Sequence, residues 1–96
     1  MFGLFSRQNP NFKEDGNFLL AKVRTSKNGE IINVRISKTS EMSPSGGGYF
    51  VRKNLVGSSS FDQATLEVNA NRYNKVKIAA VDGGELIPVK EWKNYA

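Results

Sequence analysis

The sequence predicts an all-β protein, folded as a small antiparallel barrel of five to six strands or as a sandwich. Short stretches of alternating apolar and polar residues recur along the chain, as in half-buried strands. The glycine-containing pairs Asn28-Gly29 and Gly83-Gly84 separate such stretches, and both pairs are typical of tight β-turns. The 96 residues suffice for one core, and a 39% hydrophobic composition is that of a globular chain.

The first sixteen residues are predicted to form an N-terminal arm, and residues 17–96 a single β-barrel domain. The arm shows no sustained period, yet it is rich in large apolar groups. These groups are too many for a free tail, so we expect them to pack on the domain or on a partner subunit. They are Phe2, Leu4, Phe5 and Phe12.

The chain lacks the usual signals for secretion or for a membrane. Its apolar first residues are not preceded by a basic segment or followed by a long apolar one, which argues against a signal peptide. No apolar run approaches the ~20 residues of a membrane helix. We therefore expect no membrane partner and a cytoplasmic location.

The first predicted hairpin joins residues 17–26 to residues 31–38. The Asn28-Gly29 pair indicates a two-residue type I′ turn. That turn would place Val23 opposite Val34 in the core and Lys22 opposite Arg35 on the other face. Like charges directly across a strand pair are destabilising, so this pair favours a role in binding an anion.

The middle of the chain is predicted as a long loop (39–48) followed by strands 49–54 and 63–69. Three glycines end the loop, and ordering them costs conformational entropy. A structural connection needs only two to five residues, so we expect the loop to be exposed, mobile and ordered on binding. In strand 63–69 the inward residues are Ala64, Leu66 and Val68.

A second hairpin is predicted between residues 75–81 and 85–92, around Gly83-Gly84. It would bury Ile78 and Ala80 and set Lys77 opposite Lys90 and Lys75 opposite Trp92. A helix over 70–81 is the alternative, because several apolar residues there lie roughly at helical spacing. Three asparagines and the alternation in 75–78 favour the strand.

No catalytic template fits the sequence. The chain has no cysteine and no histidine, which removes thiolate nucleophiles, ordinary zinc sites and the commonest general base. The glycine-rich stretch Ser45–Gly48 is not followed by Gly-Lys-Ser/Thr, so it is not a phosphate-binding P-loop. We therefore expect a non-enzymatic protein without a cofactor or metal.

The net charge of +5 lies in the first half of the chain. Residues 1–54 hold nine basic and four acidic residues, whereas residues 55–96 hold five of each. A basic half favours an anionic partner, with nucleic acid first and acidic protein or lipid headgroups second. The alternative is a solvated surface that happens to be basic.

Basic and aromatic residues share the predicted strands, a combination that serves to track phosphates and to stack bases. Phe18 and Phe50 are further stacking candidates, although core packing is the alternative for every aromatic. The predicted nucleic-acid-binding residues are Lys22, Arg24, Arg35, Lys38, Tyr49, Arg52, Lys53, Tyr73, Lys75, Lys77, Lys90 and Trp92.

About twenty residues resemble the small OB-fold single-stranded-DNA-binding proteins of filamentous phages. The alternating strand Ile32–Ile36 is followed by a Ser/Gly loop, Ser45 to Tyr49, ahead of a second strand. The Lys-Pro pair often found in that loop is missing. The resemblance implies an OB-like barrel and cooperative, sequence-tolerant coating of single strands by a homodimer.

Residues 68–89, if helical in the middle, are similar to small phycobilisome linker domains, which are also basic. The predicted function is therefore non-enzymatic nucleic-acid binding that prefers single-stranded DNA, by a homo-oligomer. The alternative is a structural or adaptor protein, such as a viral assembly component or a linker of that type. Such a protein would use Phe2, Leu4 and Phe5 as an apolar plug for its partner.

Overall fold

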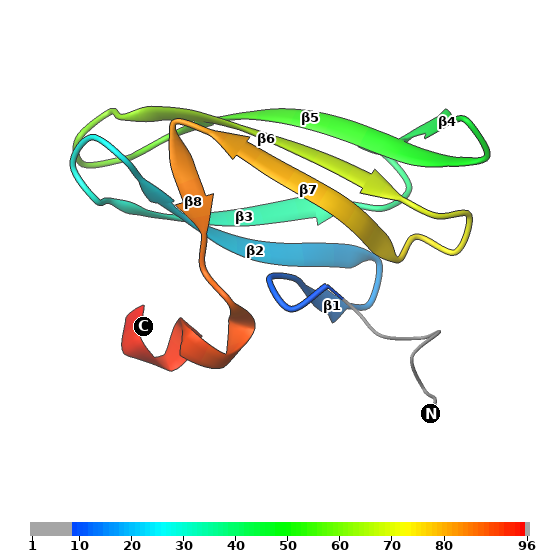
Figure 1. Cartoon of the computed structure of the whole chain (residues 1–96), viewed down its shortest axis with the longest axis horizontal. Coiled ribbons are helices and arrows are strands. Elements are labelled where there is room, and N and C mark those ends of the chain that lie inside the picture. The colour runs from blue at the N-terminus through cyan, green and yellow to red at the C-terminus, as the bar shows by residue number, and fades with distance from the viewer. Residues whose placement is uncertain (1–8, 96) are drawn as a thin grey trace.

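A computed structural model describes residues 9–95 as two antiparallel sheets followed by a short 3-10 helix (Figure 1). The elements of the described chain are β1 (Lys13–Asp15), β2 (Phe18–Thr25), β3 (Ile31–Ser37), β4 (Ser43–Ser45), β5 (Gly48–Val56), β6 (Gln63–Ala70), β7 (Val76–Asp82), β8 (Gly84–Leu86) and the 3-10 helix η2 (Val89–Tyr95).

Sheet A consists of β1, β2, β3 and β8, and sheet B runs in the order β4-β5-β6-β7. β2 pairs with β3 on one side and, on the other, with β1 near its start and β8 near its end. The prediction of an all-β antiparallel fold is confirmed. The prediction of a barrel with five to six strands is wrong, because the eight strands within residues 9–95 form two sheets that do not close.

The core lies between the two sheets and follows the predicted alternation in β2 and β6. In β2 every second residue from Leu19 to Thr25 is buried. In β6 the predicted inward residues Ala64, Leu66 and Val68 are all at most 4% exposed. Burial of such side chains stabilises a domain by roughly 1.5–3 kcal/mol each, so these alternating positions drive the packing of sheet on sheet.

The first hairpin has the predicted strands in a register shifted by two residues. Val23 pairs with Ile32, and Lys22 lies opposite Asn33 instead of Arg35. The loop has four residues because the Thr25 amide donates to the Glu30 carbonyl at 2.9 Å. Only the glycine of the Asn-Gly pair has a positive φ, of 71°, so the turn is not type I′. A two-residue shift keeps each side chain on its face, and the core is therefore correct.

The predicted loop 39–48 contains a strand of its own, so its prediction as a ten-residue loop is wrong. β4 pairs with the start of β5 across a turn at Gly46-Gly47, with φ values of 54° and 86° that favour glycine. Met42, just before β4, is 7% exposed and belongs to the core. The expected mobility of the segment stays a prediction.

The second predicted hairpin is wrong, although β7 confirms a strand over the helical alternative. β7 pairs with β6, and β8 pairs with β2, as Figure 1 shows where the chain leaves β7 and crosses to sheet A. Residues 89–95 form η2 instead of a strand, so Lys77 does not lie opposite Lys90, nor Lys75 opposite Trp92.

A register irregularity after Asn69 reverses the expected burial in β7. Val76 is buried, whereas Ile78 is 66% exposed and Ala80 is also exposed. One extra residue on a bulged strand moves every later side chain to the other face. The inward assignment of Ile78 and Ala80 is therefore wrong.

The segment predicted as an arm includes part of sheet A. Phe12 is 4% exposed in the core, and β1 pairs with Phe18–Leu20 of β2 across a turn at Gly16. Phe2, Leu4 and Phe5 lie outside the described residues. Within residues 9–95 there is no helix with the length and apolar character to cross a membrane.

Candidate nucleic-acid interface

One side of sheet A gathers the basic and aromatic residues that the alternation in β2 and β3 turns away from the core. This surface, the outer face, comprises Phe18, Leu20, Lys22, Arg24, Ile31, Asn33 and Arg35 together with Trp92 and Tyr95 of η2. Successive strand residues point to opposite faces, so the same period that buries Leu19 and Ala21 exposes this set. In Figure 1, η2 lies on the far side of β2 from sheet B.

Three cations of the outer face each lie over an aromatic ring. The Arg35 guanidinium carbon is 3.8 Å from the centre of the Phe18 ring, which comes from a diagonal position on the neighbouring strand. Lys22 Nζ lies 5.5 Å from the Trp92 ring centre. The Arg24 guanidinium carbon lies 5.0 Å from the Tyr95 ring centre. Such contacts hold the long cationic side chains against the face.

Backbone and indole hydrogen bonds attach η2 to sheet A. Trp92 Nε1 donates to the Ile87 carbonyl at 2.9 Å, and the Val89 amide donates to the Pro10 carbonyl at 2.9 Å. Ile87 is itself buried, and its amide donates to the Lys22 carbonyl. Two aromatic rings that are distant from β2 in the sequence are thereby fixed beside it.

A hollow of about 300 Å³ opens between Trp92 and Arg35. Its apolar lining is provided by Leu20 and by the Trp92 ring, while Lys22, Asn33 and Arg35 supply polar groups. Lys22 Nζ donates to Asn33 Oδ1 at 2.5 Å, which joins two directly opposed residues of the β2–β3 pair. Apolar walls with a few fixed polar groups are typical of ligand sites.

The charge around the outer face is predominantly positive. Lys22, Arg24 and Arg35 come from the strands, and η2 adds the exposed Lys90 and Lys93. The acidic residues on the neighbouring elements are Asp15 of β1, opposite Phe18, Glu85 of β8, opposite Arg24, and Glu91 of η2. Glu85 Oε2 accepts from Arg24 Nη1 at 3.2 Å, and Arg24 also donates to the Tyr95 hydroxyl.

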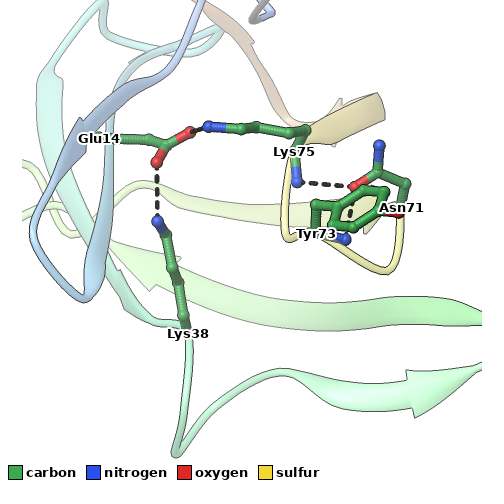
Figure 2. Close-up of polar contacts among 5 residues, drawn as sticks. All are labelled: Glu14, Lys38, Asn71, Tyr73 and Lys75. Atoms are coloured by element: carbon green, nitrogen blue, oxygen red, sulfur yellow. Dashed lines mark hydrogen bonds and ion pairs between the residues drawn. The ribbon is translucent and has the colours of Figure 1, made fainter. Parts of the chain in front are cut away.

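Other predicted site residues lie elsewhere and are engaged in ion pairs. Figure 2 shows Glu14 of β1 between Lys38 and Lys75, at 2.8 Å and 2.7 Å. In the adjoining turn, Asn71 Oδ1 accepts from the amides of Tyr73 and Lys75. These contacts join β1, the end of β3 and the start of β7, which is a structural role.

Lys53 and Arg52 are consecutive in β5 but serve opposite sides of sheet B. Lys53 donates to Glu41 Oε1 at 2.6 Å and to the Arg35 carbonyl at 2.7 Å, and so bridges β5 to the edge of β3. The Lys53 hydrogen bond lowers the pKa of Glu41. Arg52 points away from the core and pairs with Glu67 at 3.7 Å.

The remaining predicted residues are scattered. Tyr49 is half-buried and packs against the core, whereas Tyr73 is 71% exposed in the turn before β7. Lys77 is exposed in β7, and Phe50 is half-buried in β5. Of the twelve predicted site residues, the outer face therefore unites Lys22, Arg24, Arg35 and Trp92, joined by Phe18, with Lys90 exposed on η2.

Sequence reasoning missed Leu20, Asn33 and Tyr95. The signal for Leu20 and Asn33 is the strand alternation, because both residues alternate with core residues and therefore share a face with Lys22 and Arg35. Tyr95 follows Trp92 by three residues in a lysine-containing stretch, a spacing that brings side chains together in a helical turn.

A second polar cluster, the clasp, joins the β2–β3 and β5–β6 loops. Asp62 is 6% exposed and accepts from Thr25 Oγ1 at 2.7 Å and from the Asn28 amide at 2.9 Å. Glu30 accepts from the Ser59 and Ser60 amides and from Ser60 Oγ, at 2.7–3.0 Å. The pKa of Asp62 is lowered chiefly by the Thr25 hydroxyl, and that of Glu30 chiefly by the Ser60 hydroxyl.

The clasp presents an aromatic side chain. Phe61 has a φ of 61° and is 72% exposed, an unusual backbone conformation for a bulky residue. Residues 9–95 contain no group of three or more acidic residues arranged to hold a metal ion.

Comparisons with protein-family models, with curated proteins and with solved structures found no match to the chain.

Proposed function

We propose that the protein is a non-enzymatic nucleic-acid-binding protein that prefers single-stranded DNA and binds it on the outer face. The observation that carries the proposal is the set of three cations over aromatic rings, Arg35 on Phe18, Lys22 on Trp92 and Arg24 on Tyr95, on one side of sheet A. The turn before β7 holds one further such pair, Arg72 over Tyr73 at 5.8 Å, whereas the outer face gathers three.

The arrangement supplies both parts of single-strand recognition. Cations along a groove neutralise phosphates, and aromatic rings or guanidinium planes stack on bases. Stacking needs bases that are not enclosed in a duplex, which favours single strands. From Phe18 to Arg24 the strand advances about 20 Å, so one face contacts only a few nucleotides. Coating of a longer strand by a homo-oligomer follows as part of the proposal.

A salt titration with fluorescent oligonucleotides tests the proposal. Phosphate contacts make log K fall linearly with log salt, with a slope of about −0.7 per contact for single strands. Three contacts by Lys22, Arg24 and Arg35 give a slope of about −2. An affinity that does not change with salt concentration, or no binding at about 50 mM salt, contradicts the proposal.

A matched pair of variants ties the result to the outer face. Arg35→Ala removes a cation from sheet A, and Arg52→Ala removes one from sheet B, where the 65% exposed side chain pairs with Glu67. We expect the first to weaken binding and to flatten the slope, and the second to leave both unchanged. Equal losses from both would mean that only net charge matters.

The second candidate function is that of an adaptor, and Phe61 favours it. A bulky residue in the left-handed region costs about 1–3 kcal/mol and persists where its surroundings fix it. The clasp fixes it while leaving the ring exposed, as a contact for another protein would require. Size-exclusion of wild type and Phe61→Asn tests this, since asparagine tolerates the same backbone. If Phe61→Asn still elutes together with the protein partners of the wild type, the adaptor function through Phe61 is contradicted.

A further inference from the structure

We propose that the hollow beside Trp92 holds one base of the bound strand and selects keto bases (thymine, uracil and guanine) over amino bases (cytosine and adenine). The inference rests on the proposed function and deepens it, because it assigns a base preference to a face that otherwise binds any sequence.

The shape of the hollow suits a flat ring. Leu20 and the indole of Trp92 provide apolar contact surfaces within a volume of about 300 Å³. The Trp92 ring is held by its hydrogen bond to the Ile87 carbonyl, so it is already oriented before a base enters. A fixed aromatic ring loses little freedom when a base stacks on it.

The polar side chains that line the hollow are hydrogen-bond donors. Lys22 and Arg35 are donors without any acceptor. Among the described side chains that line the hollow, Asn33 alone carries an acceptor oxygen, and Lys22 Nζ occupies it at 2.5 Å. An ammonium group cannot accept, so the amide oxygen must face Lys22 and the amide NH₂ must point elsewhere. All three polar side chains are thereby donors toward a ligand.

The substituent at C4 of a pyrimidine or at C6 of a purine decides which bases fit this lining. Thymine and uracil present O4 and guanine presents O6, each of which accepts hydrogen bonds, whereas the N7 acceptor is common to guanine and adenine. Cytosine and adenine present an NH₂ group at the corresponding position. An NH₂ group set against donors leaves polar hydrogens unpaired and loses their hydration. The lining therefore favours the keto bases.

Homopolymers of matched size test the preference. Oligo(dU) against oligo(dC), and oligo(dI) against oligo(dA), each exchange a keto group for an amino group on a ring of the same size. We expect the keto strand to bind about fivefold more tightly or better in both pairs. Trp92 is the single tryptophan of the chain, so quenching of its fluorescence reports on the hollow itself. We expect stronger quenching by the keto strands.

Two variants connect the preference to the hollow. Asn33→Asp replaces a donor with an acceptor on an exposed residue, and we expect the dU over dC preference to shrink to less than about twofold. Asn54→Asp makes the same charge change at an exposed position of β5 and should leave the preference intact. Equal wild-type affinities for keto and amino strands, with salt-dependent binding retained, overturn the inference alone. A preference that survives Asn33→Asp overturns its assignment to this hollow. Absence of binding to every strand overturns the proposed function as well.

Discussion

Arg35 lies over the Phe18 ring across two neighbouring strands, with its guanidinium carbon 3.8 Å from the ring centre. Both side chains point away from the core of the sandwich, so their contact is not required to fill it. It instead holds a cationic plane against an aromatic one at the surface. An arginine plane held in this way can stack on a base and contact a phosphate at once.

The first prediction concerns that stacked pair. Phe18→Leu keeps an apolar side chain but removes the ring, so Arg35 loses its support. We expect single-strand affinity to fall about fivefold or more, because stacking is worth about 1–3 kcal/mol per base. The melting temperature should change little, because Phe18 is only half-buried. Fluorescence anisotropy and thermal unfolding measure the two effects, and a large loss of stability without a change in affinity would assign Phe18 to the fold instead.

The second prediction concerns Gly84, where β8 approaches β2. A Cβ on Gly84 would lie 2.6 Å from the Arg24 carbonyl oxygen, which is too close for any residue but glycine. Gly84→Ala should loosen β8 and, through it, η2 with Trp92. We expect lower stability, by about 1–3 kcal/mol, together with weaker oligonucleotide binding. Gly29→Ala is the control: no atom lies within 4 Å of its Cβ position, so it should cost stability through its φ of 71° but leave oligonucleotide binding unchanged.

The third prediction concerns Gly57 in the clasp. A Cβ there would lie 2.2 Å from Glu30 Oε1, whose carboxylate is held by the Ser60 hydroxyl and amide. Gly57→Ala should destabilise the fold by about 1–3 kcal/mol, because the carboxylate has to leave its hydrogen bonds. In a Glu30→Ala background the same change should cost less. Chemical denaturation of the four proteins in that cycle measures the coupling, and full additivity would contradict the contact.

The fourth prediction concerns acid. The pKa values of Asp62 and Glu30 are lowered below their ordinary values of 3.8 and 4.5 by the hydroxyl and amide donors of the clasp. The folded state then binds fewer protons than the unfolded chain. Stability is therefore fully present above about pH 4.5 and is lost as the pH falls through the lowered values. Asp62→Asn should reduce stability at neutral pH and flatten this dependence. If the dependence of stability on pH in acid stayed the same in Asp62→Asn, other carboxylates would control that dependence.

The sequence predicted those parts of the fold that depend on local periodicity. Alternation in β2 identified Leu19, Ala21 and Val23 as core residues, and that assignment held through a two-residue register error. The Asn28-Gly29 pair indicated a tight turn, but Thr25 instead donates through its hydroxyl to Asp62, which is 37 residues away. A side chain that satisfies a distant loop is invisible to a local turn rule.

The topology and the site depended on contacts between distant segments. Gly83-Gly84 resembles the turn of a hairpin, yet it carries the chain from β7 to sheet A, where β8 pairs with β2. That crossing places Trp92 over Lys22 and Tyr95 over Arg24, pairs that no local pattern joins. The basic residues of the site were predictable from charge, but their grouping on one face was not.

Amide chemical-shift mapping with a short oligo(dT) shows whether single strands bind at the outer face. If the outer face is the interface, the largest shifts fall on β2, on β3 and on η2, including the Trp92 indole N–H. The outward residues of sheet B around Arg52 and Glu67 should stay unchanged. Shifts centred on sheet B or on the turn at Tyr73, or no shifts at all, would contradict binding at the outer face.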